Sequence, residues 1–234
     1  MVLLYIPPVQ NLLRREVTAY ASKATGMQIQ VERIDLRFPL NLLVRGVEVI
    51  QQPDTLLSLE SLNVRVQAWP LLKGKVEVDE VTLSQVAVNS ANLIEGMQIK
   101  GVLGRFFLQS HGVDLSNETA VVNRTELSDT HIQLLMTDTT TTPKDTTASA
   151  PVNWKVNLHQ LKLKNVSFGM KLPADSMKMA AYIGEATIDD AKADLKNQFY
   201  GLKQFLLSGA SASYDTGEAQ PSEGFDASHM AVRN

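Results

Sequence analysis

The 234-residue sequence contains no cysteine, which excludes disulfides, thiol catalysis and cysteine-based zinc or iron–sulfur sites. Aromatic residues are scarce at 6%, and the two tryptophans, Trp69 and Trp154, are too few for the exposed aromatic platform of a carbohydrate-binding β domain. Neither charge predominates, because 22 basic and 25 acidic residues are interspersed and leave a net charge of −3. We therefore expect no nucleic-acid partner.

Motifs for catalysis and metal binding are also lacking. The sequence has no nucleophile elbow, no phosphate-binding loop and no dinucleotide fingerprint. The acidic group Asp189, Asp190 and Asp194 is expected to be solvated rather than catalytic. No histidine has a second histidine or a carboxylate at metal-ligand spacing; the four are His111, His131, His159 and His229. We expect a protein that is not an enzyme, with no catalytic residue, no metal site and no cofactor.

Long hydrophobic runs are missing too. The apolar run Val2–Ile6 has five residues, whereas a helix that crosses a bilayer needs roughly 20. It is either a short buried segment or the end of a membrane anchor whose start is missing. At the other end, the polar stretch Ser213–Asn234 gives no structural signal. We expect a fragment with a truncated C-terminus.

A repeated apolar pattern is what the sequence does contain. Residues 76–88 and 156–168 share the pattern φxφxxφxφxxφxφ, in which φ is apolar, at an offset of 80 residues. The apolar positions are Val76, Val78, Val81, Leu83, Val86 and Val88, and Val156, Leu158, Leu161, Leu163, Val166 and Phe168. Shorter copies lie at Ile29, Val31, Ile34 and Leu36 and at Leu57, Leu59, Leu62 and Val64.

The odd step in this pattern predicts a bent strand. Side chains of a flat strand alternate with a period of two, so the step from Val78 to Val81 would move later apolar residues to the opposite face. One extra residue at each xx pair, a β-bulge, keeps them on one face and curls the sheet. The predicted bulges are Asp79-Glu80, Ser84-Gln85, His159-Gln160 and Lys164-Asn165. The alternative is a sheet that is covered on both faces.

An amphipathic helix is expected before the strands. It starts after Pro7-Pro8 and ends at Gly26, with Arg14 and Arg15 opposite its apolar side. The apolar positions are Val9, Leu12, Leu13, Val17, Tyr20 and Ala24. This helix either caps the end of the sheet or lies on a membrane, and both are compatible.

The rest of the sequence reads as strands. They are expected near 28–38, 42–51, 56–68, 75–89, 93–109 (broken by Gly101 and Gly104), 119–136, 153–171, 177–188, 190–198 and 202–214. Short connections favour antiparallel pairing. We divide the chain into an anchor end and helix (1–27), a first part of a curled sheet (28–136), a threonine-rich flexible loop (137–151) and a second part (152–234). The fold class is mainly β: a helix capping a long, curled antiparallel sheet with an apolar concave face.

Up to about residue 110 the sequence resembles the N-terminal region of the AsmA and TamB family of Gram-negative cell envelopes. The resemblance rests on the order and spacing of short motifs. These are Tyr5-Ile6-Pro7-Pro8-Val9-Gln10, Thr25-Gly26, Phe38-Pro39-Leu40, Arg45-Gly46-Val47, Asp54-Thr55-Leu56-Leu57, Val64-Arg65-Val66 and Pro70-Leu71-Leu72-Lys73-Gly74-Lys75. The second half, with Tyr182-Ile183-Gly184-Glu185-Ala186 and Asp190-Ala191-Lys192-Ala193-Asp194-Leu195, is similar in style to such proteins from the Bacteroidota.

The resemblance implies a chorein-like β-gutter in the periplasm, anchored in the inner membrane, whose apolar groove conducts phospholipid between the two membranes. The implied partners are phospholipid acyl chains, the inner membrane through a missing N-terminal anchor, and an outer-membrane barrel protein. The alternative function is a scaffold for assembly of outer-membrane β-barrels. The expected groove-lining residues are Ile29, Val31, Leu62, Val64, Val66, Val76, Val78, Val81, Leu83, Val86, Val88, Val156, Leu158, Leu161, Leu163, Val166 and Phe168.

Overall fold

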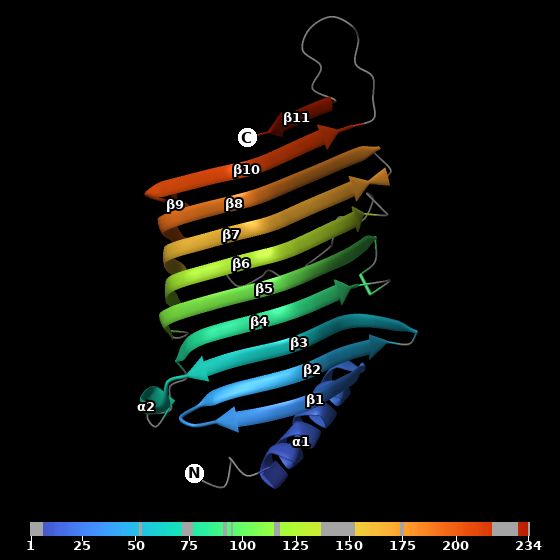
Figure 1. Ribbon diagram of the computed structural model, residues 1–234, viewed down its shortest axis with the longest axis vertical. Helices are drawn as coiled ribbons and strands as arrows, with labels where there is room; N and C mark the ends of the chain where they lie inside the picture. The colour runs from blue at the N-terminus through green and yellow to red at the C-terminus, as the bar shows by residue number, and fades with distance from the viewer. Residues whose placement is uncertain are drawn as a thin grey trace, which may run out of the picture.

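The computed structural model describes residues 7–51, 53–71, 77–90, 93–94, 96–114, 118–136, 153–173, 176–216 and 229–233. They form one curled layer of strands in the order β1-β2-β3-β4-β5-β6-β7-β8-β10-β11, with β9 beside β8 (Figure 1). The strands are β1 (Gln28–Arg37), β2 (Asn41–Gln51), β3 (Asp54–Val66), β4 (Val78–Asn89), β5 (Met97–Asp114), β6 (Thr119–Met136), β7 (Lys155–Leu172), β8 (Met177–Asp194), β9 (Phe199–Gly201), β10 (Gln204–Asp215) and β11 (His229–Arg233). The expected mainly β fold is confirmed.

Helix α1 (Pro7–Thr25) lies at the β1 end of the sheet (Figure 1). Arg14 Nη1 donates to the carbonyl of Glu32 at 2.6 Å, and the Ser22 hydroxyl accepts from Ile29 N at 3.1 Å. The helix therefore satisfies backbone groups that an edge strand would leave open. Gly26, at φ +71°, ends it as expected. Tyr20, on the apolar side of the helix, is 77% exposed and does not pack against the sheet.

One pair of strands differs from the antiparallel expectation, because β6 and β7 are parallel, with Thr119 opposite Lys155 and Leu135 opposite Lys171. Every other neighbouring pair is antiparallel. A parallel pair needs a connection of a dozen or more residues, which residues 137–154 supply. The whole of the predicted flexible loop, 137–151, lies outside the described residues, as do residues 1–6 of the anchor end and Val76.

Several element boundaries also differ. Strand β5 is not broken at Gly101 or Gly104, and β8 runs unbroken where two strands, 177–188 and 190–198, were expected. The short helix α2 (Ala68–Leu71) and strand β11 were not expected. The two parts into which we divided the sheet belong to one sheet, joined through β6 and β7.

A line of unpaired residues crosses the sheet from β1 to β10, and we call it the central crease. The pairing skips one residue in every strand along this line while the register on both sides is kept. Its members are Glu32, Gly46, Glu60, Gln85, Gly104, Asp129, Asn165, Gly184 and Gly209. A second line, the lateral crease, runs through Asn123, His159 and Asp190.

All four predicted interruptions are present, although most have another form than expected. The β3–β4 ladder skips Asp79 on one strand, which is an ordinary bulge. Gln85, His159 and Asn165 each lie opposite an unpaired residue of the neighbouring strand. Both strands of such a pair therefore contain one extra residue at the same point, and the register beyond it does not change. Left-handed backbone occurs at crease residues in several strands: Gly46, Gln85, Asp129, Asn165, Asp190 and Gly209 have φ between +50° and +61°.

The creases change which alternate residues face solvent. In β8 the exposed residues of one face are Lys178, Ala180 and Tyr182 before Gly184, then Glu185, then Asp190 and Lys192 beyond the lateral crease. Met179, which alternates with them, is 38% exposed as well. The phase of the alternation thus shifts by one residue at each crease. The apolar residues on the two sides of a crease therefore share one face of the sheet, as the repeat predicts.

Candidate functional site

The candidate site is a face of the sheet formed by apolar residues that pair across successive strands, which we call the apolar face. One row beside the central crease is Ile34, Val44, Leu62, Leu83, Phe106, Leu127, Leu163, Ala186 and Leu207. The row on the other side of the crease is Val31, Val47, Leu59, Val86, Leu103, Thr130, Val166, Ile183 and Ala210. Because paired residues point to the same side, each row is continuous across nine strands.

The predicted groove residues fall into these rows and their neighbours. Ile29, Val88 and Phe168 belong to a third row, which also contains Val49, Leu57, Ile132 and Ala181. Val64, Val81 and Leu161 belong to a fourth, with Leu36, Leu42, Leu108, Thr125, Ile188 and Phe205. Toward the strand ends Val66 pairs with Val78, Leu158 lies between Val122 and Ala191, and Val156 lies between Ala120 and Ala193. Val76 lies outside the described residues.

The sequence analysis missed the apolar residues that β5, β6, β8 and β10 contribute. Phe106, Leu108 and Leu127 lie in the middle of the rows, and Ile183 and Ile188 extend them toward β10. The same odd step would have found them, because Leu103 and Phe106 flank Gly104, and Ile183 and Ala186 flank Gly184 and Glu185.

No second layer covers the apolar face within the described part of the chain (Figure 1). Among the described side chains, the buried hydrophobic ones are Ile34, Leu56, Ala120, Val122 and Ala186. Larger members of the rows remain open to solvent: Val88 is 37% exposed, Ile132 40% and Phe168 40%. Two hollows of about 320 and 200 Å³ have mainly apolar linings, the first with Val156, Leu158 and Ile188 and the second with Phe168 and Met179. This face can therefore take up apolar surface from a ligand.

A larger hollow, of about 780 Å³, is lined mainly by residues that alternate with the apolar rows. Lys100, Lys171 and Lys178 border it together with Gln98 and Asp215. Apolar side chains, among them Leu134, Leu135, Met170 and Met179, complete its lining. Because charged and apolar residues are mixed there, we do not assign this hollow to the apolar site.

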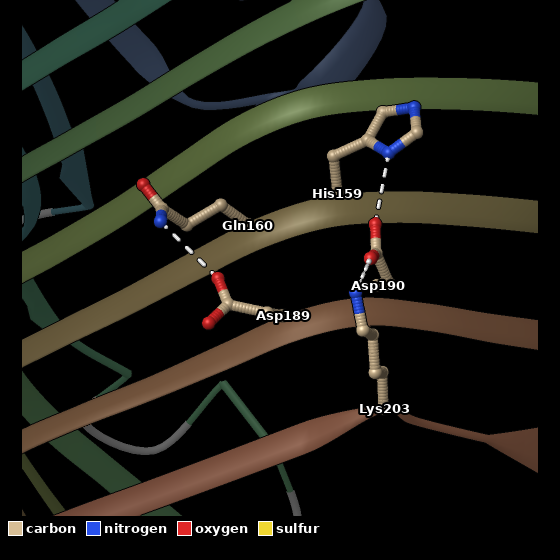
Figure 2. Close-up of polar contacts among 5 residues, drawn as sticks. All are labelled: His159, Gln160, Asp189, Asp190 and Lys203. Carbon is tan, nitrogen blue, oxygen red and sulfur yellow. Dashed lines mark hydrogen bonds and ion pairs between the residues drawn. The ribbon is translucent and has the colours of Figure 1, made fainter.

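A group of polar contacts lies on the lateral crease (Figure 2). Asp190 lies between His159, at 3.2 Å from Nδ1 to Oδ1, and Lys203, at 3.6 Å from Nζ to Oδ2. Beside them Gln160 donates to Asp189 at 3.2 Å. The hydrogen bond from His159, with Lys203 adding to it, lowers the pKa of Asp190 below its usual value of 3.8. Asp190 is exposed and already paired, and its contacts link β7 and β8 to Lys203, the residue that precedes β10.

The third aspartate of the acidic group is held in a turn. Asp194 accepts hydrogen bonds from both the backbone N and the side-chain Nδ2 of Asn197, at 3.0 and 2.9 Å, and pairs with Lys155. These contacts lower its pKa, with the Asn197 backbone bond as the largest cause. The three aspartates thus make separate contacts, with Asp189 and Asp190 inside β8 and Asp194 at its last residue.

The described residues contain no group of histidine, aspartate or glutamate side chains arranged to hold a metal ion. Within the same part of the chain, neither helix is long and apolar enough to cross a membrane. No protein-family model matches the sequence, and no curated protein matches it either.

Proposed function

We propose that this chain is part of a non-enzymatic cell-envelope protein whose apolar face conducts phospholipid by sheltering acyl chains. The observation that carries the proposal is the run of apolar rows across nine strands of a single layer that no second layer covers in the described part of the chain. A soluble domain normally buries such a face against another layer. A large exposed apolar patch is typical of an interaction site.

The energetics of moving lipid through water favour this use of the face. Each methylene removed from water contributes about 0.8 kcal/mol, so exposing a chain of roughly 16 carbons costs on the order of 12 kcal/mol. A carrier has to offset this cost along the whole path rather than in one pocket. Rows that run across the strands, perpendicular to each strand axis, provide such a path from β1 to β10.

The test places a photo-crosslinking amino acid on each face of the same region. Phe168 belongs to an apolar row, whereas Tyr182 faces Ser167 and Ser211 in a polar one, and both side chains are 40% exposed. We expect phospholipid crosslinks from position 168 and few from position 182. Native mass spectrometry of the unmodified chain should detect co-purified phospholipid.

A pair of charged variants provides the control. Phe168→Glu should remove bound lipid and Tyr182→Glu should retain it, while circular dichroism reports whether each variant remains folded. Equal crosslinking from both faces, or full lipid binding by folded Phe168→Glu, would contradict the proposal.

The location and partners belong to the same proposal. We place the chain in the periplasm of a Gram-negative bacterium, next to the inner membrane at its α1 end. This location follows from the resemblance to the AsmA and TamB family and from the position of α1 at one end of the rows.

A second candidate function is a scaffold for outer-membrane β-barrel proteins. It is favoured by the edge at β10, which within the described residues is paired with β11 at Ser211–Asp215 only. Phe205 and Leu206 at that edge are 51% and 55% exposed, and an added strand would cover them. Recovery of a barrel protein in pull-downs, with no lipid detected by mass spectrometry, would support this function over lipid conduction.

A further inference from the structure

Phe38 and Trp69, two of the most exposed large side chains, lie at one corner of the sheet. We call this corner the aromatic corner and include in it the adjacent Pro39 and Pro70. Phe38 is 85% exposed in the turn between β1 and β2, and Trp69 is 71% exposed in α2. Figure 1 places this turn and α2 at the same end of the strands.

Backbone hydrogen bonds hold the two parts of the corner together. Val66 N donates to Leu40 O at 3.0 Å, which ties the end of β3 to the β1–β2 turn. Gln67 N donates to Glu77 O at 2.9 Å, and the Gln67 side chain donates to Asp79. The exposed aromatic rings thus project from segments that are fixed to the sheet.

The chemistry of the corner matches the interface of a lipid bilayer. Insertion of an exposed phenylalanine or tryptophan into the headgroup region is favourable, because the ring leaves water while the indole N–H can still find a hydrogen-bond partner. Arg37, which precedes Phe38, is exposed and supplies a cation for anionic headgroups. We propose that the aromatic corner inserts into the surface of a bilayer that contains anionic phospholipid, through the side chains of Phe38 and Trp69.

This contact does not rest on the proposed lipid conduction, since it uses side chains at a strand end and none from the apolar rows. It identifies the side chains that make the membrane contact at the α1 end of the sheet, the end that we place next to the inner membrane and from which the rows lead away. A lipid that left the membrane here would meet the apolar face at Leu36 and Leu42, next to the turn.

The test uses the fluorescence of Trp69. The sequence has two tryptophans, so Trp154→Phe leaves Trp69 as the single reporter. With vesicles of phosphatidylcholine and phosphatidylglycerol we expect a blue shift of the Trp69 emission and quenching by lipids brominated high on the acyl chain. Emission that neither shifts nor is quenched when the vesicles are added would overturn the proposal.

Variants then locate the contact by vesicle flotation. Phe38→Ser combined with Trp69→Ser should weaken binding at least tenfold. The matched control is Phe199→Ser with Tyr200→Ser, which removes aromatic side chains of 60% and 66% exposure from β9, near the other end of the sheet. Equal loss in both double variants, or no loss in the first, would overturn the assignment to this corner. Phe168→Glu should still float with vesicles, which separates this contact from lipid uptake by the apolar face.

Discussion

Asn165 Nδ2 donates a hydrogen bond to Asp129 Oδ1 at 2.7 Å, between two parallel strands and at the same point of the central crease. Both residues have left-handed backbone, at φ +52° and +51°. Asparagine and aspartate tolerate this conformation better than other residues with a side chain. The pair therefore stabilises the crease in the middle of the sheet, where the phase of the apolar pattern changes.

Replacing Asn165 tests the strain at the crease. Asn165→Val should destabilise the protein by about 2 kcal/mol, because a β-branched side chain is strained at positive φ and the bond to Asp129 is lost. Asn165→Gly should cost less, since glycine adopts this backbone freely. Urea unfolding measures both. Asn157→Val, at an exposed position earlier in β7, is the control, and an equal loss there would argue against a special role of the crease.

Gly104 tests the close approach of neighbouring strands at the crease. A Cβ at this position would lie 2.7 Å from Asp129 Cβ and 3.0 Å from Asp129 O. We expect Gly104→Ala to cost about 1–3 kcal/mol, because the backbone of β6 has to move. Gly169→Ala in β7 is the matched control, since its Cβ would meet nothing closer than Met179 O at 4.0 Å. Thermal unfolding should show a clearly lower midpoint temperature for Gly104→Ala than for Gly169→Ala.

The length of the connection between β6 and β7 limits how the sheet can form. If β6 were straight, Thr119 and Met136 at its two ends would lie about 56 Å apart, at roughly 3.3 Å per residue. The connection has to cover this distance, because in a parallel pair β7 starts beside the first residue of β6. The chain from Met136 to Lys155 spans at most about 65 Å when fully extended. Deleting eight residues, 140–147, leaves at most about 40 Å, so we expect the parallel pair to be lost. Replacement of the same residues by eight of glycine and serine should preserve the fold, as judged by circular dichroism.

Acid should weaken the contacts on the lateral crease. The folded-state pKa of Asp190 is below 3.8, so its contribution is present above about pH 4 and is lost as the pH falls through that lowered value. Stability measured from pH 6 to pH 2 should fall less steeply in Asp190→Asn than in the unmodified protein. Asp189→Asn, next to it and facing the neutral Gln160, is the comparison. An unchanged slope in Asp190→Asn would show that the pairing with His159 and Lys203 does not contribute.

The strands and the interruptions in their pattern could be predicted from local sequence. The alternation and its odd step are both visible in the spacing of Val78, Val81, Leu83 and Val86. The pairing is interrupted at Asp79 and at Gln85, inside the odd steps. The parallel pairing of β6 and β7 could not be predicted in this way, because the partner of a strand depends on contacts between distant residues. The placement of Phe38 and Trp69 at one corner likewise depends on contacts between distant residues, such as the bond from Val66 at the end of β3 to Leu40 in the β1–β2 turn.

The sequence by itself determined that the chain is mainly β, that an N-terminal helix precedes the strands, and where the apolar pattern changes phase. Periodicity is a local property, so it survives any choice of strand partners. The tertiary structure alone decided that the interruptions of neighbouring strands align into two creases, and that the apolar residues join into rows across nine strands. It also decided that no second layer in the described part of the chain covers them. These features depend on register and on the order of strands, which are fixed only when distant segments pair.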